Sequence, residues 1–174
     1  HVRITAFADR TLEELVTVLR QLQQLGVEGV VLDLRDNAGG DLETAVAVSD
    51  LFLDAGQTIV TIKDRFENVR QQYVASEDGP FDTLPLAVLI DRNSASASES
   101  LAACLQDNGR AVVIGDRSFG KGTVQHLIDI GPPVALRGSE QPPVLKLTSA
   151  SYWRPSGKNI HRKGGTYKRD DEAD

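Results

Sequence analysis

Two short stretches of the sequence contain residue types that could do chemistry. One is the serine-rich DRNSASASES, residues 91–100, and the other is GDRSFGKGT, residues 115–123, which places Lys121 between two glycines. A serine in the first turn of a helix suits acyl transfer, because free backbone N–H groups there can stabilise an oxyanion. A lysine can serve as its general base when the amine is neutral. The simpler alternatives are helix capping by serine and a solvated loop charge.

The loop around Lys121 also has nearly the spacing of a phosphate-binding P-loop. That motif requires a preceding strand, a Ser or Thr directly after the lysine, and a helix that begins there. Residues 110–115 (RAVVIG) supply a strand, but Gly122 occupies the hydroxyl position. The following residues, TVQHLIDI, alternate as in a second strand. Nucleotide binding is therefore the weaker interpretation of this loop.

Composition limits the class of protein. The chain has 174 residues, of which 40% are apolar and 25% charged, and this predicts a single globular domain. Its net charge of −6 argues against nucleic acid or an anionic membrane as the main partner. Cys104 stands alone, which excludes an intramolecular disulfide, and we expect it in the core. No apolar run reaches the roughly 18 to 20 residues of a membrane span.

Strand and helix patterns alternate along the chain, which predicts an α/β layered domain. Strands are predicted at residues 2–7, 29–34, 57–63, 85–90, 110–115, 123–130 and 144–153. Helices are predicted from a capping box at Thr11 and Glu14 to about Gly26, from about Leu42 to Leu53, and at residues 95–109. The run at 29–34, GVVLDL, is expected to be buried on both faces. Residues 64–83 are expected to be a long polar connection, and residues 164–174 a solvated or disordered tail.

Three loops follow the ends of apolar strands. They are RDNAGG at residues 35–40, the serine-rich stretch, and the loop with Lys121. Functional sites in α/β domains form where such loops meet, so we expect these three to lie together.

Four longer stretches resemble, in order, the signatures of the carboxy-terminal processing proteases, also called tail-specific proteases. They are VVLDLRDNAGG, DRNSASASES, QDNGRAVVIGDRSFGKGTVQ and LTSASYWRPSGKNI, and the resemblance runs from about Val2 to Lys163. It implies a serine endopeptidase that cuts proteins near apolar C-termini through a Ser-Lys dyad and an acyl-enzyme, without a cofactor. It also implies the layered fold of repeated strand-strand-helix units found in crotonases and Clp protease, over a core of residues 1–163.

The resemblance implies a role for individual residues. Ser96, the middle serine of SASAS, would be the nucleophile and Lys121 the general base. Gln125 matches the glutamine of the family, and the backbone amides of Gly40 and Ala97 would form the oxyanion hole. Burial of Lys121 away from carboxylates would favour the neutral amine that a base needs. Strand alternation would put Gln125 on the same face as Lys121, where its amide could orient the amine without adding charge.

Members of this family usually carry a PDZ domain that captures the free C-terminus of a substrate, and this chain has no room for one. Because the chain also begins with His1 rather than Met, we expect a processed protein or the catalytic core of a longer one. In residues 164–174 the chain departs from the Pro-Asp continuation of the family. The resemblance implies a periplasmic, secreted or plastid-lumen location. A non-enzymatic ligand-binding or peptide-binding module on the same fold is the alternative function.

Two other chemistries are disfavoured. A Ser-His-Asp triad would need a well-placed histidine, but His1 is terminal, His161 is near the polar tail, and His126 alternates away from Gln125. A metal site is not expected, because the acidic residues near the glycine loop have no His or Cys ligands beside them. These residues are Asp33, Asp36 and Glu43.

Overall fold

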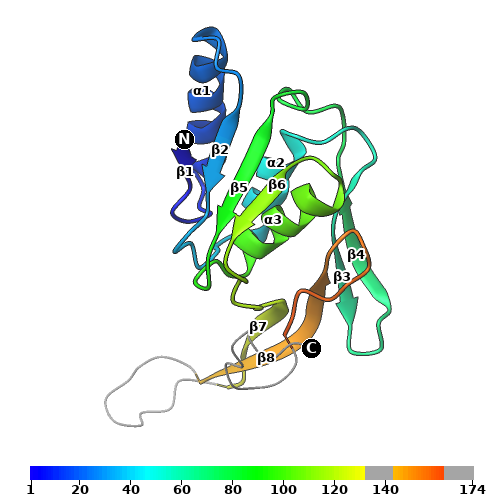
Figure 1. Cartoon of the computed structure of the whole chain (residues 1–174). Coiled ribbons are helices and arrows are strands. Elements are labelled where there is room, and N and C mark those ends of the chain that lie inside the picture. The colour runs from blue at the N-terminus through cyan, green and yellow to red at the C-terminus, as the bar shows by residue number, and fades with distance from the viewer. Residues whose placement is uncertain (132–142, 163–174) are drawn as a thin grey trace, which may run out of the picture.

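The structure is a computed structural model, and it describes residues 1–131 and 143–162. The helices are α1 (Thr11–Gln24), α2 (Leu42–Asp50) and α3 (Ala97–Asp107). The strands are β1 (Val2–Arg3), β2 (Val30–Asp33), β3 (Thr58–Asp64), β4 (Val69–Val74), β5 (Leu86–Ile90), β6 (Val112–Gly115), β7 (Thr123–Asp129) and β8 (Val144–Trp153). Figure 1 shows their arrangement.

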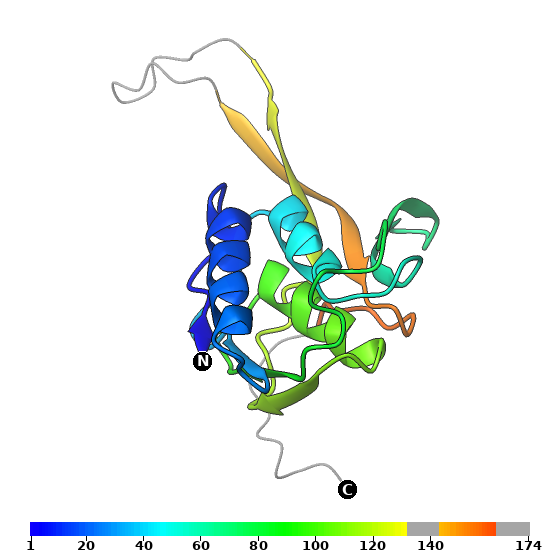
Figure 2. The ribbon, with the colours of Figure 1, turned by 90° about the horizontal axis from the view of Figure 1, so that it is seen from above.

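The strands form two four-stranded sheets. One is parallel in the order β1-β2-β5-β6, and the other is antiparallel in the order β4-β3-β8-β7. Helices α2 and α3 pack on each other, and α3 contacts both β6 and β3, so the helices connect the two sheets. Figure 2 shows α1, α2 and α3 side by side. The predicted α/β layered class is confirmed.

The core lies between the parallel sheet and the helices. Leu32 of β2 and Val88 of β5 are paired in register and fully buried. On the opposite face of the sheet, Val31 is only partly buried and Val112 is 66% exposed. The expected burial of β2 on both faces is therefore wrong, because the helices cover only one face of the parallel sheet in the described part of the chain. Cys104 is fully buried, as predicted.

Helix α1 begins where the sequence predicts, but its cap differs. Thr11 is already helical, and its hydroxyl accepts a hydrogen bond from the Ala8 N–H and donates one to the Ala6 carbonyl. The predicted capping box at Thr11 is wrong because the hydroxyl binds the preceding loop. Gly26 follows the helix with a left-handed φ of 70°, which confirms it as the stop signal.

The largest error in the predicted elements is that strand β4 was not expected. It lies inside the expected polar connection at residues 64–83 and pairs antiparallel with β3. Nearly all of its side chains are exposed, because it is the edge strand of its sheet, so it lacks the apolar alternation of a half-buried strand. Strand β1 ends at Arg3 and α2 at Asp50, and α3 and β6 are also shorter than predicted. The predicted tail at residues 164–174 lies outside the described residues.

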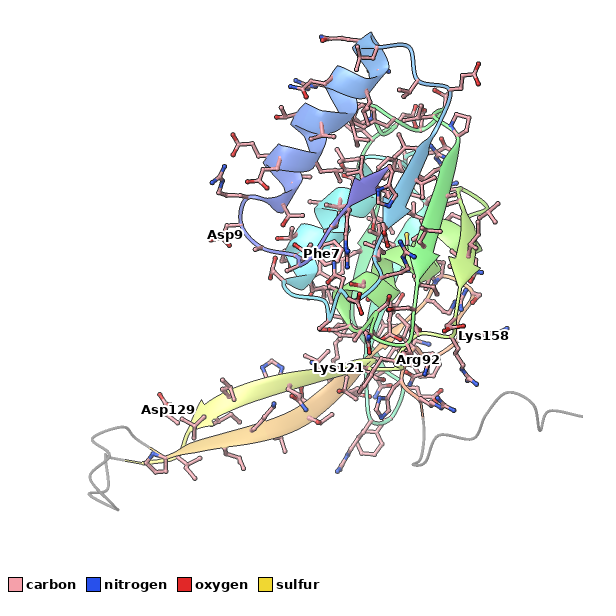
Figure 3. All side chains as sticks on the ribbon, turned by 60° about the vertical axis from the view of Figure 1, so that its left-hand side comes forward. Phe7, Asp9, Arg92, Lys121, Asp129 and Lys158 are labelled. Carbon is pink, nitrogen blue, oxygen red and sulfur yellow. The ribbon has the colours of Figure 1, made fainter. Side chains whose placement is uncertain are left out.

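Strands β7 and β8 extend from the body of the domain as a two-stranded arm (Figures 2 and 3). The loop with Lys121 lies at its base, immediately before β7. Helices of the described residues are all too short or too polar to cross a membrane.

Candidate active site

The turn between β5 and α3 presents Ser96. Within this turn, the Ser94 hydroxyl donates to the Leu34 carbonyl at 2.8 Å and accepts from the Asp91 N–H at 3.0 Å. The Asp91 carboxylate accepts from the Asn93 and Ser94 N–H groups. These bonds fix the turn to the loop after β2. Ser94 is therefore a structural residue of the turn.

Ser96 differs from the residues around it in exposure and in backbone conformation. Among residues 94–100 it alone is not buried. Its φ is 58°, and the residue lies directly before the first residue of α3. Such a positive φ is uncommon outside glycine, and strained residues of this kind cluster at functional sites. The neighbouring Ser98 is buried and donates to the Asn37 carbonyl at 3.0 Å, so its hydroxyl has a structural role.

The glycine loop after β2 packs against this serine. Asn37 is fully buried, and its carbonyl accepts from the Ala95 N–H while its side-chain oxygen accepts from the Gly39 N–H. A Cβ on Gly39 would lie 2.9 Å from the Ser96 Cβ, so only glycine allows this approach. Two of the three predicted loops thus lie together.

The backbone amides that the sequence predicts for an oxyanion hole are those of Gly40 and Ala97. Within the described residues, neither the Gly40 N–H nor the Ala97 N–H donates a hydrogen bond. Ala97 is the first residue of α3, where N–H groups have no intrahelical acceptor. Gly40 follows Gly39 in the chain and is paired with Phe7 in an isolated bridge. The predicted oxyanion residues therefore have the donors that the role requires.

A buried carboxylate joins the loop with Lys121 to the start of α3. Oε2 of Glu99 accepts from the Ser96 N–H and from the Lys121 N–H, both at 2.8 Å. Oε1 accepts from the Gly120 N–H at 2.6 Å and from the Ser118 hydroxyl at 2.7 Å. The backbones of the predicted nucleophile and base thus meet at one oxygen atom. The sequence signal for Glu99 was its position three residues after Ser96, which is capping-box spacing.

On its other side, the loop with Lys121 contacts the end of β8 and the segment that follows it. The Gly120 carbonyl accepts from the Arg162 N–H at 3.1 Å, and the Gly122 carbonyl accepts from the Tyr152 N–H at 2.8 Å. A Cβ on Gly122 would lie 2.3 Å from the His161 nitrogen, so the backbone packs closely at this glycine. Lys121 itself is exposed (Figure 3), and its expected burial is wrong because these contacts involve the loop backbone.

Gln125 lies near the start of β7 and is exposed. The strand begins at Thr123, so its alternation does not extend back to Lys121, and the pairing of β7 with β8 is irregular between Val124 and Gln125. Strand alternation therefore does not place Gln125 on the same face as Lys121. The same strand argues against the P-loop interpretation, because β7 follows Lys121 where a P-loop requires the start of a helix.

The other candidate groups serve structural purposes in the structure. His1 lies 3.0 Å from the Asp33 carboxylate, which also binds Arg35 at 2.7 Å. Hydrogen bonds from Arg35 lower the pKa of Asp33 to about 2, against the desolvation that would raise it. Asp36 binds Arg3 and accepts from the Asn93 amide. In residues 1–131 and 143–162, no group of three His, Cys, Asp or Glu side chains could hold a metal ion.

Comparisons with known proteins agree with this geometry. The sequence model of peptidase family S41 matches residues 1–168. The carboxy-terminal-processing protease of Bartonella bacilliformis is 39% identical, over 95% of this chain and 37% of its own length. The chloroplastic carboxyl-terminal-processing peptidase 3 of Arabidopsis thaliana is 34% identical, over 94% of this chain and 30% of its own.

Among solved structures, the photosystem II D1 C-terminal processing protease superposes with a TM-score of 0.81 at 34% identity. The match covers 91% of this chain and 38% of that protein. This chain therefore spans about a third of the length of the relatives that it matches. The family match covers nearly the whole chain, and the two sequence relatives are 39% and 34% identical to it. The chain belongs to peptidase family S41.

Proposed function

We propose that these residues form the catalytic core of a serine endopeptidase that processes the C-termini of proteins. The observation that carries the proposal is the arrangement at the start of α3. There a partly exposed serine with a strained backbone directly precedes Ala97 and packs against Gly39, and in the described residues the Gly40 and Ala97 amides donate no hydrogen bond. Donors that are preorganised in this way stabilise the negative charge that develops during acyl transfer.

In the proposed cycle, the Ser96 hydroxyl oxygen attacks the carbonyl carbon of the scissile peptide bond while the Lys121 amine takes the hydroxyl proton. The Gly40 and Ala97 amides bind the resulting oxyanion. The C–N bond then breaks, and Lys121 returns the proton to the leaving amine. Water attacks the acyl-enzyme ester with Lys121 again as base, which frees Ser96. Gln125 would orient the amine without adding charge.

The base requires a neutral amine, and Lys121 is exposed in this chain. We infer that bound substrate, or the part of the longer protein beyond these residues, covers it. A PDZ domain in a longer parent chain would fit that role, and protein substrates with apolar C-termini would be its ligands. The plant relative is named as chloroplastic, which is compatible with the proposed plastid-lumen, periplasmic or secreted location.

Cleavage of an unfolded model protein with an apolar C-terminus tests the proposal. The assay uses both the 174-residue chain and a longer chain with its neighbouring domains. We expect Ser96→Ala and Lys121→Ala each to lower kcat on the order of 10³-fold or more, at an unchanged free energy of unfolding. The exposed Ser156 and Lys146 provide matched controls, and Ser156→Ala and Lys146→Ala should cut like wild type.

Full activity of Ser96→Ala would refute the nucleophile assignment. If both wild-type chains are inert but bind the substrate, the chain is instead a binding module on a protease fold.

A further inference from the structure

Glu99 holds together two parts of the proposed active site that lie about twenty residues apart in the chain. Its side chain is buried, with 4% of its surface exposed. Burial of a carboxylate is costly unless hydrogen bonds compensate for the lost water. Here four donors do so, and three of them are backbone N–H groups: those of Ser96, Gly120 and Lys121. The fourth is the Ser118 hydroxyl.

These contacts exceed what helix capping needs. A capping-box glutamate binds the N–H of the cap residue, which here is Ser96. The remaining three bonds all go to residues 118–121 and contribute nothing to the helix end. They instead fix the backbone from which the Lys121 side chain extends. Since one oxygen binds both the Ser96 and the Lys121 N–H, the relative placement of the two backbones depends on this atom.

We propose that Glu99 is a positioning residue that sets the distance between the nucleophile Ser96 and the base Lys121. It acts through the two backbones and does not contact substrate. The proposal rests on the proposed Ser-Lys dyad. A carboxylate is required because its two oxygens can accept all four hydrogen bonds. A glutamine would keep one acceptor and turn an NH₂ group toward backbone N–H donors, which repel it.

The first test does not depend on activity. In the wild-type chain, hydrogen bonds to Glu99 should slow hydrogen exchange at the Gly120 and Lys121 amides. Glu99→Gln should speed exchange at these two amides about tenfold or more, while the amide of Leu19 in α1 keeps its rate. Equal protection of Gly120 and Lys121 in both proteins would overturn the proposal.

The second test uses the chain length that cleaves substrate in the assay above. Titration with a serine-directed reagent counts the competent active sites. Because kcat is calculated per titrated site, misfolded protein does not lower its value. We expect Glu99→Gln to lower this kcat at least about tenfold with KM changed less than about twofold, because positioning acts on the chemical step. Glu99→Asp, which keeps the charge on a shorter side chain, should recover part of the loss.

Ser118→Ala removes one bond to the same carboxylate and leaves Ser96 and Lys121 intact. It should lower kcat per site a few-fold, and it carries the test if Glu99→Gln does not fold. Unchanged turnover per site in Glu99→Gln, or in Ser118→Ala where that variant stands in for it, would mean that Glu99 only supports the fold. Ser96→Ala is measured in parallel, and turnover by it at the wild-type rate would overturn the dyad as well.

Discussion

Alanine in place of Gly39 is expected to destabilise the chain strongly, because this glycine lies against the turn that presents Ser96. Its φ of 102° is left-handed, which costs a residue with a Cβ about 1–2 kcal/mol. The new Cβ would also lie 2.6 Å from the Ala95 carbonyl oxygen and 3.0 Å from the Ala97 nitrogen. These are backbone atoms that cannot rotate away, and such overpacking costs about 1–3 kcal/mol more. The expected total is about 2–5 kcal/mol.

Gly26 supplies the matched control for this substitution. Its φ is also left-handed, at 70°, but no atom lies within 4 Å of the position of an added Cβ. Gly26→Ala should therefore cost only the conformational term, about 1–2 kcal/mol. Urea denaturation at equilibrium measures the free energy of unfolding of both variants and of wild type. Equal losses in the two variants would refute the close packing of the glycine loop against the serine turn.

Two further predictions concern titratable groups. Because Arg35 lowers the pKa of Asp33 from 3.8 to about 2, Asp33 stabilises the folded chain above about pH 4 by about 2 kcal/mol, and this is lost as the pH falls through about 2. The difference in unfolding free energy between wild type and Asp33→Asn should shrink over that range, and a constant difference would contradict the assignment. Burial raises the pKa of Cys104 to about 12, so iodoacetamide at pH 8 should label this thiol only in urea; rapid labelling of the folded chain would disagree.

Helices and strands whose own residues show an apolar pattern could be predicted from the sequence. Strand β8 has the predicted bounds, Val144–Trp153, and the buried runs of β2 and β5 appear where short apolar stretches stand. Strand β4 was missed because the residues at its centre, 70–72, are polar and exposed. Its strand conformation follows from pairing with β3, and the sequence of residues 69–74 does not by itself indicate that pairing.

The residues of the candidate site also differ in whether the nearby sequence gives a signal for their role. Ser96 and Lys121 could be identified from their sequence motifs. The positive φ of Ser96 sets this residue apart in the structure, which agrees with the role that the motif assigns to it. Glu99 was not predicted, because its spacing from Ser96 indicates only a helix cap. Its other contacts reach a loop about twenty residues further along the chain. The exposure of Lys121 was missed for a related reason: flanking glycines indicate close packing of a backbone but do not say where the side chain lies.

The strained backbone of Ser96 must be held by its surroundings, since such a conformation costs on the order of 1–3 kcal/mol. The apolar core does not supply this, because Ser96 is partly exposed and its immediate contacts are polar or backbone groups. The Glu99 carboxylate binds its N–H, the Ser100 hydroxyl donates to its carbonyl at 3.4 Å, and Gly39 packs on its Cβ. Apolar periodicity therefore predicts the layers that bring the three loops to one place. Buried polar contacts between those loops set the geometry that the chemistry needs, and they leave little trace in the periodicity of the sequence.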